Sequence, residues 1–157
     1  MKRNDNKVLQ LIILLLVVAV VVALFITLFT FLFKSSKEQA KETVETFYAY
    51  EQNGAFSESW DMFHPLMKDK FSKEHYLQDR AHVFLNHFEV TTFDFYLEDI
   101  EKLTNWEMEE GTEIISEVYK VPVAQVYKGK YGNFTIYQNV FTTEIDGEWT
   151  ILWSYQK

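Results

Sequence analysis

The sequence VLQLIILLLVVAVVVALFITLFTFLF occupies residues 8–33, and only Gln10, Thr27 and Thr30 interrupt its run of apolar side chains. A helix needs about 20 apolar residues to cross about 30 Å of hydrocarbon. At about 1.5 Å per residue the 26 residues of this run extend about 39 Å. A cleaved signal peptide has an apolar region of only about 7–15 residues and ends at a cleavage site of small residues, whereas this run ends in Phe-Leu-Phe-Lys. We therefore predict an uncleaved transmembrane helix over Val8–Phe33.

The residues on either side of this helix predict its orientation. Lys2, Arg3 and Lys7 precede it, while acidic residues dilute the lysines that follow it, so the positive-inside rule slightly favours a cytoplasmic amino terminus. The residues before Lys7 are also too few to fold. We expect residues 1–7 to be a cytoplasmic tail, 34–37 a short linker and 38–157 an extracytoplasmic domain. The protein is then a single-pass protein of the cell membrane with its carboxy-terminal domain outside the cell.

Charge differs between the two parts of the chain. Residues 1–34 carry four basic side chains against one acidic side chain, a net charge of +3, whereas the remaining 123 residues carry 11 basic and 22 acidic side chains, a net charge of −11. An acidic surface repels nucleic acid, which argues against nucleic-acid binding. The chain has no cysteine, so neither a disulfide framework nor a lipid-bearing cysteine is expected.

Apolar residues at helical spacing predict three helices after the linker. The first begins at a capping box in Ser-Ser-Lys-Glu, residues 35–38, and ends at Asn53-Gly54. The second is expected to place Trp60 in the core and to end at His64-Pro65, because the residue before a proline avoids helical angles. Ser72 caps the third. The predicted inner face of this third helix consists of Tyr76, Leu77, Ala81, Phe84, Leu85 and Phe88, and its outer face of His75, Gln78, Asp79, His82 and Asn86.

From Val90 onward the apolar period changes to two, which predicts strands. Phe93, Phe95 and Leu97 alternate with polar residues, and further strands are expected at residues 100–108, 113–128, 133–145 and 148–155. We expect Pro122 to mark an edge or a bulge and Asp146-Gly147 to form a two-residue hairpin. On the last strand Trp149, Trp153 and Tyr155 should share one face. The predicted fold class is α+β, with about three helices packed on a curved antiparallel sheet.

Three stretches of this region resemble one known module: VETFYAYEQNGAF at residues 44–56, FSKEHY at residues 71–76 and DGEWTILWS at residues 146–154. Residues 38–157 resemble the amino-terminal domain of methicillin-resistance-type penicillin-binding proteins, a member of the nuclear-transport-factor-two-like superfamily. The resemblance implies a cone-like domain in a Gram-positive cell envelope. In those proteins a transpeptidase domain with a nucleophilic serine follows, whereas this sequence ends at Lys157. The resemblance therefore carries no active site to this chain.

Polar clusters give little support for a metal site. His75 and His82 lie seven residues apart, about 10 Å along a helix, too far to bind one ion together even if Asp79 joined either of them. The cluster Glu107, Glu109, Glu110 and Glu113 is typical of a solvated acidic loop rather than of a calcium loop. We predict no metal and no cofactor.

A catalytic interpretation depends on the resemblance, since relatives in the superfamily use a carboxylate or histidine at the floor of the cone as a general base. Candidates here are Asp61, His64 and Asp94, beside Tyr48 and Tyr76. Asp61 and His64 lie one helical turn apart and would simply pair, and Asp94 alternates with phenylalanines and so faces water. We therefore predict that the protein is not an enzyme, and keep Tyr48, Asp61, His64 and Tyr76 as candidate pocket residues.

Aromatic residues are the remaining signal, with 27 Phe, Trp and Tyr side chains in the chain. The segment from Tyr119 to Tyr155 carries more of them than one face of a small sheet needs to bury. Aromatic residues on an exposed sheet face are typical interface anchors, although they would equally line a pocket. The candidate partner-binding residues are Tyr127, Tyr137 and Tyr155.

Three functions remain open on this basis. The first is a non-catalytic interaction or scaffold module of a Gram-positive envelope, linked to cell-wall synthesis; the second is a scaffold subunit of a conjugation or secretion channel; the third is a small-ligand-binding or sensory domain. The expected partners are the lipid bilayer, through Val8–Phe33, and a protein at the cell envelope. A weak homodimer is a further alternative.

Overall fold

The computed structural model describes residues 2–32, 34–82, 92–130 and 132–156. The chain divides into two units, residues 1–35 and residues 36–157. The predicted linker at residues 34–37 is shorter in the structure, because the helix of the second unit already begins at Ser36.

The first unit is one helix, α1, over Lys2–Leu32. Its segment Ile12–Phe29 is long and apolar enough to cross a membrane, and its side chains are exposed throughout. Thr27 satisfies its own hydroxyl by donating to the carbonyl oxygens of Ala23 (3.0 Å) and Leu24 (2.9 Å), so this polar residue does not interrupt the apolar surface. A helix of this kind near the amino terminus fits a membrane anchor or a signal sequence.

The second unit begins with four helices among the described residues: α2 over Ser36–Gln52, α3 over Phe56–Asp61, α4 over Pro65–Lys70 and α5 over Lys73–Ala81. The predicted first helix is confirmed as α2, and its apolar stripe is buried at Ala40, Val44, Phe47 and Tyr48. The predicted cap of α5 is confirmed as well, since Ser72 Oγ accepts from the His75 N–H at 3.3 Å. The other residues assigned to that third helix, Phe84, Leu85, Asn86 and Phe88, lie outside the described residues.

The predicted second helix is wrong at its carboxyl end. It ends at Asp61 as α3, and Pro65 starts a further helix, α4, that the sequence did not predict. His64 is extended, as expected before a proline, but it serves as the N-cap of α4: its Nδ1 accepts from the Leu66 N–H at 3.1 Å. Proline suits the first position of a helix, where no N–H is needed.

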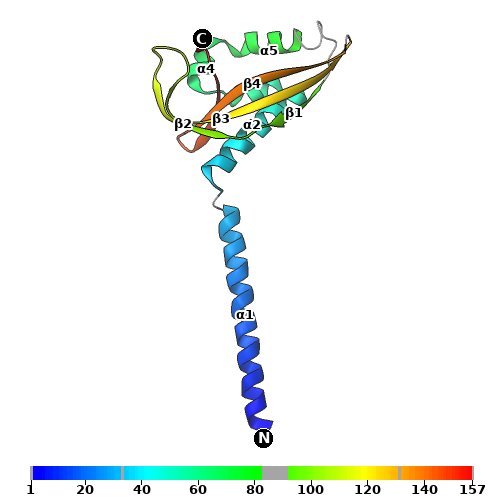
Figure 1. Ribbon diagram of the computed structural model, residues 1–157, viewed down its shortest axis with the longest axis vertical. Coiled ribbons are helices and arrows are strands. Elements are labelled where there is room, and N and C mark those ends of the chain that lie inside the picture. The colour runs from blue at the N-terminus through cyan, green and yellow to red at the C-terminus, as the bar shows by residue number, and fades with distance from the viewer. Residues whose placement is uncertain (1, 33, 83–91, 131, 157) are drawn as a thin grey trace. The chain divides into compact units, whose positions relative to one another are not determined.

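Five antiparallel strands form one sheet within the described part of the chain, which confirms the α+β class. They are β1 over Phe93–Leu97, β2 over Glu101–Glu107, β3 over Ile114–Gly129, β4 over Gly132–Ile145 and β5 over Glu148–Trp153. β3 is central: β1 and β2 pair with successive parts of it, β4 pairs along it, and β5 pairs with β4. Helix α2 packs across β1, β3, β4 and β5 (Figure 1).

The Asp146-Gly147 hairpin between β4 and β5 is confirmed. Both residues have positive φ, 53° and 86°, which is the pattern of a tight hairpin turn. Pro122 differs from its prediction, because it lies in the central strand β3 opposite Asn139 rather than at a sheet edge or bulge. Its carbonyl accepts from the Glu98 N–H at 2.9 Å. Pro122 lies between the parts of β3 that pair with β1 and with β2, so neither strand needs the N–H that proline lacks.

The main core lies between α2 and the sheet. Trp149 and Trp153 share the face of β5 that looks toward α2, as predicted: the Trp149 indole donates to Gln39 (3.3 Å), and the Trp153 ring lies 6.3 Å from that of Phe47. Trp60, expected in the core, is only partly buried at its margin, and the ammonium groups of Lys68 and Lys73 lie over its ring at 5.0 Å and 5.2 Å.

The opposite face of the sheet holds a second apolar group. Cross-strand pairing places Leu103 beside Val118 and Phe141 beside Leu152 on this face. Trp106 of β2 stacks on Phe141 with ring centroids 4.4 Å apart. Val118 and Leu152 are fully buried, so this end of the sheet is covered on both faces.

Candidate functional site

The predicted pocket residues Tyr48, Asp61, His64 and Tyr76 do not line a common pocket within the described part of the chain. Tyr48 and Tyr76 are buried in the core. The Asp61 carboxylate faces outward and pairs with Lys73 at 2.7 Å instead of with His64, and His64 caps α4. Burial lowers the pKa of His64, which keeps its Nδ1 free to accept the capping hydrogen bond. The arrangement gives His64 a structural role.

A buried charged network that the sequence did not predict lies beside Tyr76. Glu51 of α2 is only 3% exposed, and its carboxylate accepts from the side chains of Ser59, Tyr76 and Arg80. Burial, reinforced by the Glu51 charge, raises the pKa of Tyr76. Glu51 lies three and four residues after Tyr48 and Phe47, on the apolar stripe of α2, and this position is the signal in the sequence that would have identified it.

Tyr48 belongs to a second buried chain of polar contacts. Its hydroxyl donates to Gln138 (3.2 Å) and accepts from Gln125 (3.5 Å), and Gln125 in turn accepts from the Tyr127 hydroxyl at 2.7 Å. Burial raises the pKa of Tyr127 to about 12. Both tyrosines therefore stay neutral hydrogen-bonding groups at physiological pH, holding α2 to β3 and β4.

The candidate partner-binding tyrosines divide between the two faces of the sheet. Tyr127 is fully buried, between the rings of Phe93 and Phe134, so its assignment to an exposed contact surface is wrong. Tyr137 is 74% exposed. The pairing register places it beside Ala124, whose partner on the other side is Tyr96, itself 61% exposed. Tyr96 and Tyr137 therefore flank Ala124 on an uncovered surface, which we call the tyrosine face.

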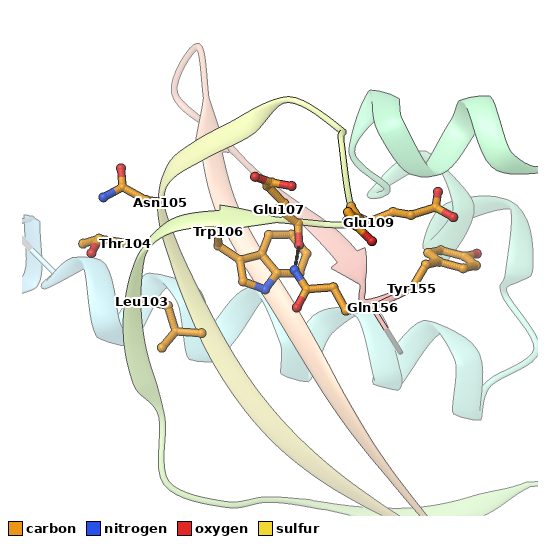
Figure 2. Close-up of a pocket in the computed structure, with 9 residues that line it drawn as sticks. Leu103, Thr104, Asn105, Trp106, Glu107, Glu109, Tyr155 and Gln156 are labelled. Carbon is orange, nitrogen blue, oxygen red and sulfur yellow. Dashed lines mark hydrogen bonds between the residues drawn. The ribbon is translucent and has the colours of Figure 1, made fainter.

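Tyr155, the third candidate, lies at a pocket beside β2 that the sequence analysis did not predict (Figure 2). The pocket has a volume of about 820 Å³, and it is lined by Leu103, Thr104, Asn105, Trp106, Glu107, Glu109, Glu110, Tyr155 and Gln156. The Tyr155 N–H donates to the Met108 carbonyl (2.8 Å), and the Gln156 amide donates to the Glu107 carbonyl (2.6 Å). Burial raises the pKa of Tyr155, against the opposing effect of Lys70.

The remaining polar candidates are exposed. His75 and Asp79 of α5 and His82, the residue that follows the helix, are exposed. Asp94 faces solvent beside Lys128 at 3.3 Å, as expected from its alternation. In the described ranges, no group of three or more His, Cys, Asp or Glu side chains is placed to hold a metal ion.

No protein-family model matches this chain, and comparison with curated proteins finds no match either. The two candidate binding sites of the molecule are therefore the tyrosine face and the pocket beside β2.

Proposed function

We propose that this protein is a membrane-anchored, non-catalytic interaction module of a Gram-positive cell envelope, with α1 as the anchor and residues 36–157 outside the cytoplasm. The sequence resemblance to the amino-terminal module of penicillin-binding proteins suggests a link to cell-wall synthesis and a cone-like domain. The length and apolar surface of Ile12–Phe29 support the anchor. The partner is a protein of the envelope.

One observation carries the interaction function, namely the exposure of Tyr96 and Tyr137 around Ala124. Large tyrosine rings lose little conformational freedom when they are ordered, and they are enriched among the residues that dominate binding energy. The pairing register places the small Ala124 side chain between the two tyrosines. This geometry suits a flat protein surface or an extended segment.

The tyrosine face predicts a site-specific contact in cells. A photoreactive benzoylphenylalanine at position 137 of the full-length protein should give one discrete cross-linked product, and the same group at the exposed Glu58 position of α3 should not. Once mass spectrometry has identified the partner, Tyr137→Ala should weaken its binding by about tenfold or more. Thr135→Ala is the matched control, since Thr135 is an exposed residue on the same face of β4.

Two results would contradict the assignment of this face. A product of identical mass from positions 137 and 58 would indicate crowding at the membrane rather than a contact. An affinity unchanged by Tyr137→Ala would move the binding surface elsewhere. A product between two copies of this chain would replace the envelope partner by a homodimer.

Membrane topology is a separate prediction. If α1 is an uncleaved anchor with a cytoplasmic amino terminus, protease added to intact, wall-stripped cells should remove a tag at the carboxy terminus and leave an amino-terminal tag protected. The length of the apolar helix motivates this expectation. A protected carboxy-terminal tag, or a mature protein that begins after α1, would overturn it.

The alternative function as a scaffold subunit of a conjugation or secretion channel makes the same use of α1 and of the tyrosine face. It differs in the identity of the partner, so the cross-linked product distinguishes the two. A small-ligand or sensory role is less well supported, because Tyr48 and Tyr76 are packed in the core rather than lining an open cavity.

A further inference from the structure

Strand β2 leaves one of its edges unpaired by any strand, and among the described residues the backbone of that edge is met only by the Gln156 amide, at the Glu107 carbonyl. The segment 62–64 covers β5: the Ile151 N–H donates to the Met62 carbonyl (2.9 Å), and the His64 N–H donates to the Ile151 carbonyl (3.0 Å). At the start of β1, the Gln52 amide donates to the Phe93 carbonyl at 2.6 Å. β2 pairs with β3 alone within the described residues. An unpaired strand edge presents backbone donors and acceptors to another chain.

The pocket beside β2 lies along this edge. Five consecutive residues of β2, Leu103 to Glu107, line it, and the tail residues Tyr155 and Gln156 line it as well. The tail crosses the end of β2 through its hydrogen bonds at Glu107 and Met108. Figure 2 shows Trp106 in the middle of the pocket, with Glu107, Glu109 and Tyr155 on the side toward the tail. An extended peptide along β2 would meet these side chains where the strand ends.

The pocket has more negative than positive charge. Glu107, Glu109 and Glu110 all line it, and Lys70 contacts one of them, Glu109. The Lys70 ammonium contacts the Glu109 carboxylate and lies 5.1 Å from the centre of the Tyr155 ring. This internal contact demonstrates that an ammonium group fits between a carboxylate and an aromatic ring here. Glu107 and Glu110 remain without a cation among the residues described by the structure.

Trp106 adds an observation that is independent of the acidic cluster. Its side chain is 92% buried, since its exposure is 8%, and its ring is fixed by stacking on Phe141. Within the described ranges its indole N–H has no protein hydrogen-bond partner, and it is not one of the fully buried unpartnered nitrogens, which belong to Trp60 and Trp153, so it is open to the pocket. Figure 2 shows the nitrogen-bearing edge of the ring turned toward Gln156. An indole N–H that opens into a pocket can donate to an acceptor on a bound group. A bare cation has no hydrogen-bond acceptor for this indole N–H, whereas a peptide has its carbonyl oxygens.

We propose that this pocket binds an extended basic peptide segment, which adds as a strand to the free edge of β2 and places a lysine or arginine side chain against Glu107 and Glu110. A carbonyl of the peptide accepts from the Trp106 indole, and the basic side chain lies near the Tyr155 ring beside Lys70. Backbone pairing supplies affinity in such strand addition, and side-chain pockets supply specificity. The site is separate from the tyrosine face and does not depend on it.

The test uses the full-length protein in micelles of an uncharged detergent and a fluorescein-labelled octapeptide of alternating lysine and threonine. Fluorescence anisotropy should show binding of this peptide about tenfold tighter than binding of two controls. The first control alternates glutamate with threonine and has the wrong charge. The second alternates lysine with proline, which keeps the charge but removes half of the backbone N–H groups needed for strand pairing.

Variants of the protein locate the site. Glu107→Gln combined with Glu110→Gln should weaken binding of the lysine–threonine peptide by about tenfold. The matched pair Glu58→Gln and Glu74→Gln removes two exposed carboxylates from α3 and α5 and should have no effect. Trp106→Phe keeps an aromatic ring on Phe141 but removes the N–H, and it should weaken binding by about threefold or more.

Three outcomes would overturn the proposal. Equal binding of the lysine–proline peptide would mean that the acidic surface attracts cations diffusely without strand addition. Equal weakening by the two pairs of glutamate variants would mean that the peptide has no defined site. Binding unaffected by both Trp106→Phe and the Glu107/Glu110 pair would place the peptide outside this pocket.

Discussion

Replacing Arg80 by methionine is expected to lower the free energy of unfolding of residues 36–157 by about 3–5 kcal/mol. Glu51 is almost completely buried, and its carboxylate has Arg80 as its contacting cation among the described residues. Removing that cation leaves a buried charge whose remaining donors, Ser59 and Tyr76, are neutral. Urea denaturation of this unit, followed by tryptophan fluorescence, measures the change.

A double variant separates the charge from the packing. Arg80→Met together with Glu51→Gln should recover much of the loss, because a neutral amide can still accept from Ser59 and Tyr76 and no buried charge remains. Lys41→Met is the surface control: Lys41 and Glu45 form an exposed pair at 3.5 Å, so little change is expected. If Arg80→Met unfolds at nearly the wild-type urea concentration, the pair contributes no more than a surface ion pair.

Glu51 also illustrates where sequence patterns become insufficient. The spacing of Ala40, Val44 and Phe47 correctly predicted the buried stripe of α2, because apolar side chains that share one face of a helix are most stable when that face is buried in the core. Glu51 continues the same stripe, but a glutamate at the end of an apolar stripe is normally exposed. Only the arrival of Arg80, 29 residues later on another helix, makes its burial possible.

The strands show a related division. Alternation and the Asp146-Gly147 turn were sufficient to predict β1, β4 and β5 to within a few residues, because these signals are local. Which tyrosine is exposed depends on register: Tyr127 is opposite Phe134, which puts Tyr127 and Tyr137 on different faces of the sheet. Alternation within each strand cannot relate two strands, so Tyr127 and Tyr137 appeared equivalent in the sequence.

The pocket beside β2 could not be predicted for a similar reason. Its acidic turn was recognised in the sequence, but Tyr155 and Gln156 come from the far end of the chain and reach Glu107 only when β5 and the tail are in place.

Pro65 shows the opposite situation, since the same residue had two local interpretations. A proline can mark the end of one helix or occupy the first position of the next. The hydrogen bond from the Leu66 N–H to His64 shows that Pro65 begins a helix.

The second large effect is expected at Phe63. Its ring lies 5.2 Å from Phe47, 5.3 Å from Tyr76 and 4.9 Å from Trp153, and it is 1% exposed. Phe63→Ala should therefore cost about 3–5 kcal/mol, because the rigid rings around it cannot close the cavity that it leaves. The urea midpoint of residues 36–157, again followed by tryptophan fluorescence, gives this value.

Phe63→Ala should also promote association, which a simple core cavity would not. Residues 62–64 hold the outer edge of β5 through hydrogen bonds with Ile151, and Phe63 anchors this segment in the core. Loosening it exposes a strand edge that can pair with another chain. Val121→Ala, which removes a fully buried side chain from the central strand, is the control with a core cavity but an intact edge. Light scattering at equal fractions of folded protein should show larger particles for Phe63→Ala alone; equal scattering from both variants would mean that segment 62–64 does not protect β5.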